Sequence, residues 1–198
     1  MKRSLTIHAV VWLALAAMAT LSLTTNAFQG DKKIRLLDDC EPVSFNAALG
    51  DGACVGNGHT TFDEFIAELS ATQDAHKWRN QPSDMQVNVG RPTFIENRGG
   101  EVHTFTPVAE FGGGFIPDLN GISGNPVPAP ECLNVPALVF IPAGGTEEGP
   151  TAGSAELPVG SHKFQCCIHP WMRTVIDVKA PGKSSGPSGP TKGGGHQH

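Results

Sequence analysis

Three side chains of the kinds that bind soft metals stand within one short stretch near the end of the chain. The stretch CCIHPWM places Cys166, His169 and Met172 in the pattern Cys-x-x-His-x-x-Met. Thiolate and thioether sulfurs favour copper, especially Cu(I), and imidazole suits both copper oxidation states. Structural zinc gains little from methionine, so copper fits this donor set better than zinc. The spacing predicts a compact loop that holds three donors around one copper ion.

A further histidine is needed to complete a trigonal copper site with two imidazoles, one thiolate and a weak axial thioether. His103 is the candidate, because it lies in the β-prone segment GGEVHTFT directly after a Gly-Gly turn. A strand there could bring its imidazole beside the loop. The Cys-x-x-Cys redox motif and the Cys-x-x-Cys-His haem motif are both absent from the sequence. A catalytic Cys-His pair would leave Met172 without a role.

Short β-prone runs separated by turn residues follow Trp78, and these elements would have to position the donors. Strands are expected over 85–89, 93–96 and 101–106, and later in ALVFIPAGG, HKFQCC and RTVIDVK. Such spacing is typical of an antiparallel β-sandwich or barrel. The clearest helix signal is in 60–69, where Thr61 and Glu64 have the spacing of a capping box. Residues 111–131 are rich in Gly and Pro, which predicts a long loop.

The two ends of the chain differ in composition from its middle. Residues 1–27 combine a short basic head, an apolar run and small residues at two candidate cleavage sites, which is typical of a secretory signal peptide. The run is shorter than the ~20 apolar residues that a membrane span needs. Residues 181–198 are rich in Gly, Pro and Ser, which predicts a flexible tail. We therefore expect a leader at 1–27, an N-terminal extension with one helix at 28–77, a β-domain at 78–180 and a tail at 181–198.

The charge of the chain is acidic. Its formal net charge is −5, and cleavage of the predicted leader would remove Lys2 and Arg3 and leave 12 basic against 19 acidic residues, a balance of −7. The sequence shows no basic stripe, so nucleic acid is not an expected partner.

These features together resemble the cupredoxin family, in particular the plastocyanin and amicyanin type of blue-copper protein. CCIHPWM is similar in length and in its His-Pro step to the short amicyanin loop, and HTFT resembles the upstream ligand segment. The resemblance covers roughly residues 80–180. It implies an all-β, Greek-key β-sandwich with one type 1 copper per chain, and the N-terminal helix lies outside that minimal domain. The implied metal ligands are His103, Cys166, His169 and Met172. Thr104 departs from the pattern, because many members carry Asn there.

The spacing of the family selects Cys166, rather than its neighbour Cys167, as the metal ligand. Neighbouring residues in a strand point to opposite faces, so Cys167 is free for another role. An exported protein tends to pair its remaining thiols, and four cysteines allow three connectivities. Cys40 and Cys54 flank a short Gly-rich loop, so we favour that disulfide. A disulfide between Cys132 and Cys167 then follows by elimination.

The predicted leader implies export to the periplasm or secretion. The resemblance implies a soluble, monomeric one-electron carrier that cycles between Cu(I) and Cu(II). Four protein ligands leave no open position at the copper for a substrate, so we do not expect an enzyme. The resemblance further implies that His169 reaches the surface and that a redox protein docks near His169 and Trp171. Pro170 would share this apolar rim, together with Phe111, the glycines 112–114 and Phe115. The first alternative is a copper storage or delivery module without redox turnover. The second is an extracellular interaction domain whose metal site is vestigial.

Overall fold

The computed structural model describes residues 32–148 and 157–181, without the side chains of 146–148. The predicted leader at 1–27 lies outside the described residues, and so does the predicted tail from residue 182 onward. In the part that is described, no helix is long and apolar enough to cross a membrane.

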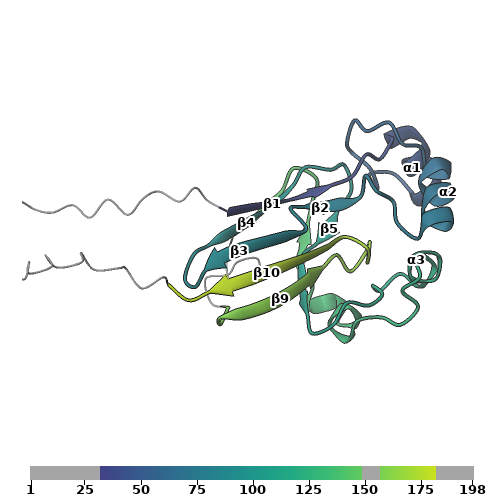
Figure 1. Cartoon of the computed structure of the whole chain (residues 1–198). Coiled ribbons are helices and arrows are strands. Elements are labelled where there is room, and N and C mark those ends of the chain that lie inside the picture. The colour runs from purple at the N-terminus through teal and green to yellow at the C-terminus, as the bar shows by residue number, and fades with distance from the viewer. Residues whose placement is uncertain (1–31, 149–156, 182–198) are drawn as a thin grey trace, which may run out of the picture. The chain divides into compact units, whose positions relative to one another are not determined.

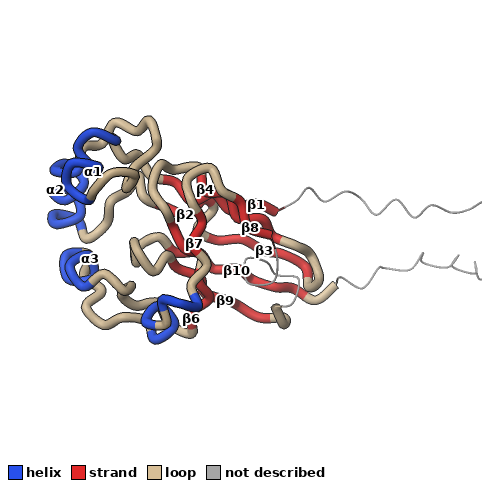
Figure 2. The backbone as a smooth tube through the Cα atoms, turned by 180° about the vertical axis from the view of Figure 1, so that it is seen from behind, coloured by secondary structure: helices blue, strands red, loops and turns tan. Residues whose placement is uncertain are grey.

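Two four-stranded sheets form the body of the fold, as the ribbon and tube views show (Figure 1, Figure 2). The first sheet has the order β2-β1-β4-β8, with bounds Arg79–Gln81, Lys32–Leu37, Thr93–Asn97 and Thr146–Glu148. The second has the order β3-β10-β9-β6, with bounds Asp84–Asn88, Arg173–Lys179, Gly160–Gln165 and Thr106–Val108. A separate pair joins β5, His103–Thr104, to β7, Phe140–Ile141. The predicted all-β sandwich is confirmed.

Alternating side chains explain why these segments become strands with one buried face. In β10 the side chains of Thr174, Ile176 and Val178 are buried and alternate with more exposed neighbours. Such a period of two residues places every second side chain on the same face of a sheet. Ile176 and Val178 join a hydrophobic core to which β1 contributes Ile34 and Leu36. The core therefore fills the space between the two sheets.

The strand pairing differs from the expected antiparallel pattern in two places. β1 pairs with β4 in parallel, and β10 pairs with β3 in parallel. The strand expected over 101–106 is also divided, because β5 pairs with β7 whereas β6 pairs with β9. The chain changes partners at Phe105, which is buried and stacks on Phe164 with ring centroids 4.7 Å apart. Local sequence favours strands in these runs but does not determine which distant strand each one pairs with.

The described part of the N-terminal extension contains more structure than the one helix that the sequence predicts. It contributes β1 to the first sheet, and it forms α1, Pro42–Leu49, and α2, Phe62–Thr72. The expected capping box at the start of α2 is confirmed, since the Thr61 side chain accepts from the Glu64 backbone N–H and Glu64 reaches back to the backbone of Thr61. The extra strand is stabilised by pairing with β4, a contact between distant segments that a local pattern does not reveal.

The helices lie at one end of the sandwich, and the loop between β9 and β10 lies at the same end (Figure 1, Figure 2). The long loop at 111–131 contains the short helix α3, Pro117–Ile122. It leads into two 3-10 turns at Pro130–Leu133 and Val135–Ala137. The ligand loop contacts α2 through Phe65, the long loop through Phe115 and the first 3-10 turn through Cys132.

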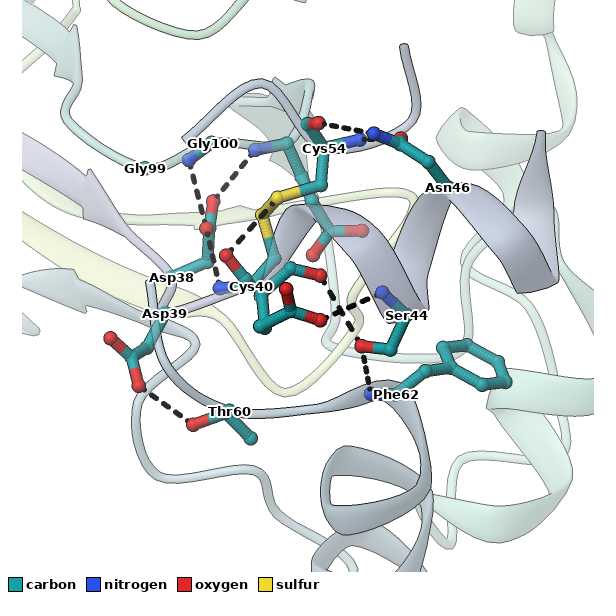
Figure 3. The surroundings of a disulfide bond; sticks show 12 residues. Asp38, Asp39, Cys40, Ser44, Asn46, Cys54, Thr60, Phe62, Gly99 and Gly100 are labelled. Carbon is teal, nitrogen blue, oxygen red and sulfur yellow. Dashed lines mark hydrogen bonds between the residues drawn. A yellow bond between two sulfur atoms is a disulfide. The ribbon is translucent and has the colours of Figure 1, made fainter. Parts of the chain in front are cut away.

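Both expected disulfides are present. Cys40 pairs with Cys54 beside α1 (Figure 3), and Cys132 pairs with Cys167 at the end of β9. Cys166 is the one cysteine left free, and it is buried. The adjacent cysteines therefore differ in chemistry, as the sequence predicts.

Candidate metal centre

The ligand loop is a short connection between two long antiparallel strands. β9 ends at Gln165 and β10 begins at Arg173, so residues 166–172 must turn the chain within seven positions. Two backbone hydrogen bonds close the loop: Cys166 N–H donates to the Met172 carbonyl at 3.0 Å, and Met172 N–H donates to the His169 carbonyl at 2.9 Å. This closure fixes Cys166 and His169 on a rigid turn.

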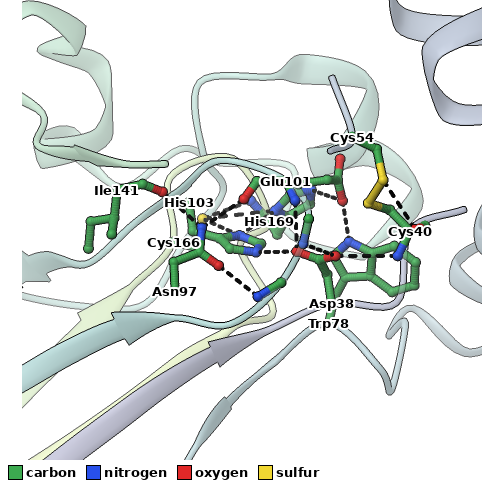
Figure 4. Close-up of polar contacts among 12 residues, drawn as sticks. Asp38, Cys40, Cys54, Trp78, Asn97, Glu101, His103, Ile141, Cys166 and His169 are labelled. Atoms are coloured by element: carbon green, nitrogen blue, oxygen red, sulfur yellow. Dashed lines mark hydrogen bonds and ion pairs between the residues drawn. A yellow bond between two sulfur atoms is a disulfide. The ribbon is translucent and has the colours of Figure 1, made fainter. Parts of the chain in front are cut away.

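Three of the four predicted ligands come together in space (Figure 4). His103 reaches the loop from β5, and its Nδ1 atom lies 3.9 Å from Cys166 Sγ and 3.2 Å from His169 Nδ1. A triangle with sides of 3.2, 3.9 and 4.0 Å has a point about 2.2 Å from each corner. Metal–imidazole and metal–thiolate bonds in proteins are ~2.0–2.3 Å long for a first-row ion such as zinc. The donors are therefore spaced to hold one metal ion of this size.

The cluster is enclosed by the protein. Cys166 and His103 have no exposed surface, and His169 is 3% exposed. Two backbone N–H groups, those of Thr104 and His169, donate to Cys166 Sγ at 3.4 and 3.5 Å. Hydrogen bonds of this kind around a thiolate tune the properties of a metal site.

The electrostatics of the cluster favour a thiolate at Cys166. Burial by itself raises the pKa of the thiol, but hydrogen bonds and charges from His103 and His169 lower it well below its ordinary value. Burial by itself lowers the pKa of His103, but its contacts with Asp38 and Cys166 raise that pKa to about 10. Since the thiolate and the neutral imidazole are the forms that bind metals, metal binding would displace protons from this site.

Met172, the fourth predicted ligand, is fully buried and packs in the same core cluster as Cys166. Its backbone takes part in both hydrogen bonds that close the loop. Its role as an axial ligand stays a prediction.

Thr104, at which the sequence departs from the family pattern, connects the two ligand segments. Its backbone N–H donates to Cys166 Sγ, and its hydroxyl accepts from the backbone N–H of Cys167 at 2.8 Å. Thr104 is fully buried. A side chain with one acceptor oxygen is therefore sufficient to hold β5 against the start of the ligand loop.

Two buried carboxylates behind the histidines were not among the residues that the sequence pattern indicated (Figure 4). Asp38 Oδ2 lies 2.9 Å from His103 Nε2, and Glu101 Oε2 lies 3.7 Å from His169 Nε2. Trp78 donates its indole N–H to Glu101. Burial raises the pKa of Glu101, whereas the pKa of Asp38 is lowered to about 2 because the contacts with His103 and two backbone N–H groups outweigh its burial. The sequence offers one local indication of their role. Glu101 lies two positions before the predicted ligand His103, and Asp38 lies two positions before Cys40.

The expectation that His169 reaches the surface is wrong. Its ring packs against Phe65 of α2, with centroids 6.4 Å apart, and against Trp171 at 5.4 Å. Phe65 in turn contacts Trp78 at 4.5 Å and Trp171 at 6.0 Å. Phe65 of the N-terminal extension and Trp171 of the ligand loop therefore cover His169. Trp171 itself is partly exposed.

The long loop at 111–131 is attached to the ligand loop on the other side. Phe115 N–H donates to the carbonyl of Cys167 at 2.9 Å. Directly after this loop, Cys132 adds a covalent link through its disulfide with Cys167. Phe111 lies under two cations, with Arg173 at 4.8 Å and Lys163 at 5.8 Å from its ring centre. Of the expected apolar rim, Pro170 is buried, whereas Phe111 and Phe115 are partly exposed.

No protein-family model matches this sequence, and the comparison with curated proteins found no match. Among solved structures, the chain is similar to a purple cupredoxin from Nitrosopumilus maritimus, at 13% identity and a TM-score of 0.39, over 75% of this chain and 100% of that one. It is also similar to a plastocyanin from Dryopteris crassirhizoma, at 12% identity and a TM-score of 0.35, over 74% of this chain and 99% of that one. An amicyanin from Paracoccus versutus matches at 14% identity and a TM-score of 0.32, over 51% of this chain and 73% of that one.

The fold is a β-sandwich of two sheets, in the strand orders β2-β1-β4-β8 and β3-β10-β9-β6. The cluster of His103, Cys166 and His169 is a feature of this chain itself, and its distances and burial define the site.

Proposed function

We propose that this protein is an exported one-electron carrier with a single type 1 copper site formed by His103, Cys166, His169 and Met172. The observation that carries the proposal is the buried triangle of two imidazole nitrogens and one thiolate sulfur, whose sides leave room for one metal ion. Two imidazoles and a thiolate with a weak thioether are the donors of blue-copper electron-transfer sites. A bound copper ion would supply one-electron exchange between its Cu(I) and Cu(II) states.

The chain's own residues favour redox cycling with little rearrangement. Cys166 and His169 are fixed by the closed loop, and Thr104 ties Cys166 to the strand that carries His103. A packed interior does not deform continuously, so these donors keep their spacing when the charge at their centre changes. The enclosure of all three donors also argues against an enzyme, because a substrate in solution has no direct access to them.

The contact for electron transfer is Trp171 in this proposal. Within the ligand loop Ile168 and Trp171 are partly exposed, and the Trp171 ring packs on the His169 ring at 5.4 Å. A redox protein that docks over Trp171 would come close to a ligand without touching the buried imidazole. Export is supported by the two disulfides, since such bonds persist in oxidising compartments.

Copper storage or delivery is the competing function, and a reduction experiment in the presence of a Cu(I) chelator separates the two. The copper-loaded protein is oxidised, reduced and reoxidised while the metal that reaches the chelator is measured. A carrier keeps its copper through repeated cycles and shows one reversible potential. Transfer of the metal to the chelator on reduction would contradict the carrier function and support delivery, and a protein that binds no copper would contradict both.

A further inference from the structure

The carboxylate of Asp38 lies directly behind one of the proposed copper ligands (Figure 4). Asp38 follows the end of β1, and its side chain is 1% exposed. Its Oδ1 atom accepts from the backbone N–H groups of Gly100 at 2.8 Å and Cys40 at 3.3 Å. Its Oδ2 atom accepts from the backbone N–H of Glu101 at 3.1 Å and faces His103 Nε2 at 2.9 Å. A buried carboxylate is tolerated because its oxygens are satisfied in this way.

This arrangement determines which nitrogen of His103 faces the cluster. An ionised carboxylate can only accept hydrogen bonds, so His103 Nε2 must carry the proton that it shares with Asp38. The Nδ1 atom then points toward Cys166 and His169, and it is the nitrogen that can give up its proton and bind a metal. A hydrogen bond at the second nitrogen of a metal-binding histidine fixes the ring orientation and raises its basicity.

Two glycines leave the space that Asp38 and the neighbouring disulfide occupy. A Cβ atom on Gly99 would lie 1.8 Å from Asp38 Oδ2, and one on Gly100 would lie 2.7 Å from Cys40 Sγ. The Gly-Gly turn before the strand of His103 therefore lets the carboxylate and the Cys40–Cys54 disulfide approach closely (Figure 3). The glycines that predict a turn in the sequence therefore also make room for Asp38, the hydrogen-bond partner of His103.

We propose that Asp38 is a positioning residue of the copper site, which holds His103 Nδ1 toward the metal and lowers the reduction potential of the bound copper. The inference rests on the proposed function, because it requires that copper binds this cluster. A negative charge one imidazole away from the metal favours the more positive oxidation state. The segment before residue 78 lies outside the region that resembles the family, but through Asp38 it would help to position a metal ligand.

The test compares Asp38→Asn with Asp39→Asn. Asparagine keeps the size of the side chain but removes the negative charge beside His103. We expect Asp38→Asn to weaken copper binding tenfold or more, the range known for changes to the hydrogen-bond partner of a metal-binding histidine, and to raise the reduction potential. Asp39 is the matched control, since its carboxylate pairs with Lys77 at 2.6 Å and Thr60 at 2.7 Å instead of with a ligand. Asp39→Asn should leave both copper affinity and potential unchanged.

A measurement on the unaltered protein tests the same contact if Asp38→Asn does not fold. Nitrogen-15 spectra of the Cu(I)-loaded protein should show His103 protonated at Nε2, with a proton that exchanges slowly with water. A metal bond at Nε2, or a proton there that exchanges as fast as that of the exposed His76, would overturn the proposal. So would an Asp38→Asn variant that folds and keeps the copper affinity and potential of the unaltered protein. If the unaltered protein binds no copper, the proposed function itself fails.

Discussion

Cys166 and Cys167 are adjacent in the chain but belong to different packing environments. Cys166 packs in the main hydrophobic core with Met172, whereas Cys167 packs in a second cluster with Cys132 and Val108. The two sulfur atoms therefore cannot substitute for each other without rearrangement of the loop. This separation allows one residue to act as a thiolate ligand while its neighbour holds a structural bond.

Serine substitutions separate the two roles. Cys166→Ser removes the thiolate, and we expect the copper-loaded variant to lose its intense visible absorption because that absorption requires the copper–thiolate bond. The control is the double variant Cys132→Ser/Cys167→Ser, which should keep the colour but lower the free energy of unfolding by about 4 kcal/mol, as the chain-entropy model gives for a loop of this length. Absorption spectra and chemical denaturation check both results. A coloured Cys166→Ser protein would contradict the assignment.

The carboxylates of Asp38 and Glu101 form a second layer around the metal-binding cluster. Each lies behind one imidazole of the cluster, and both are buried from solvent. The sequence pattern could not identify them, because a carboxylate near a ligand in space need not have any fixed spacing from it in the chain. Asp38 lies sixty-five positions before His103.

At the scale of elements, the ligand loop depends on the long loop that packs against it. Gly114 lies where a Cβ atom would be 1.9 Å from the carbonyl oxygen of Cys167. That carbonyl also accepts the backbone N–H of Phe115. The absence of a side chain at residue 114 therefore lets the two loops pack closely beside the metal-binding cluster.

Alanine at two glycines tests this contact. Gly114→Ala must push the two loops apart, and we expect the free energy of unfolding to fall by about 2 kcal/mol, within the range for overpacking. Gly121→Ala is the control, because Gly121 is in α3 and a Cβ atom there meets nothing within 4 Å. That variant should be as stable as the parent or gain up to ~1 kcal/mol from helix propensity. Denaturant unfolding of both variants gives the comparison, and equal stability of Gly114→Ala and the parent would refute the packing argument.

The helices before residue 78 show what local sequence can and cannot predict. The capping box of Thr61 and Glu64 is a contact between near neighbours, so its spacing in the sequence was sufficient to predict the start of α2. The burial of His169 depends instead on Phe65 and Trp171, which are 106 positions apart and meet only in the folded chain. The family resemblance implied an exposed histidine because it did not include the helix that covers it.

At the scale of the whole molecule, the sequence was most informative where one segment carries most of the chemistry. The spacing of Cys166, His169 and Met172 predicts a turn between two strands, and the structure has that turn between β9 and β10. The pairing of β1 with β4 and the division at Phe105 could not be predicted, because strand partners are chosen by contacts across the sandwich. The two disulfides were predictable because few pairings remained once Cys166 was set aside.

His103, Cys166 and His169 hold one copper ion, in the function proposed above, through a thiolate and two imidazoles. The most direct test is a visible absorption and electron paramagnetic resonance spectrum of the purified protein, loaded with one equivalent of copper and oxidised. We predict an intense visible band and a copper hyperfine splitting narrower than that of ordinary tetragonal Cu(II). A colourless sample with the broad splitting of a tetragonal site would contradict the account.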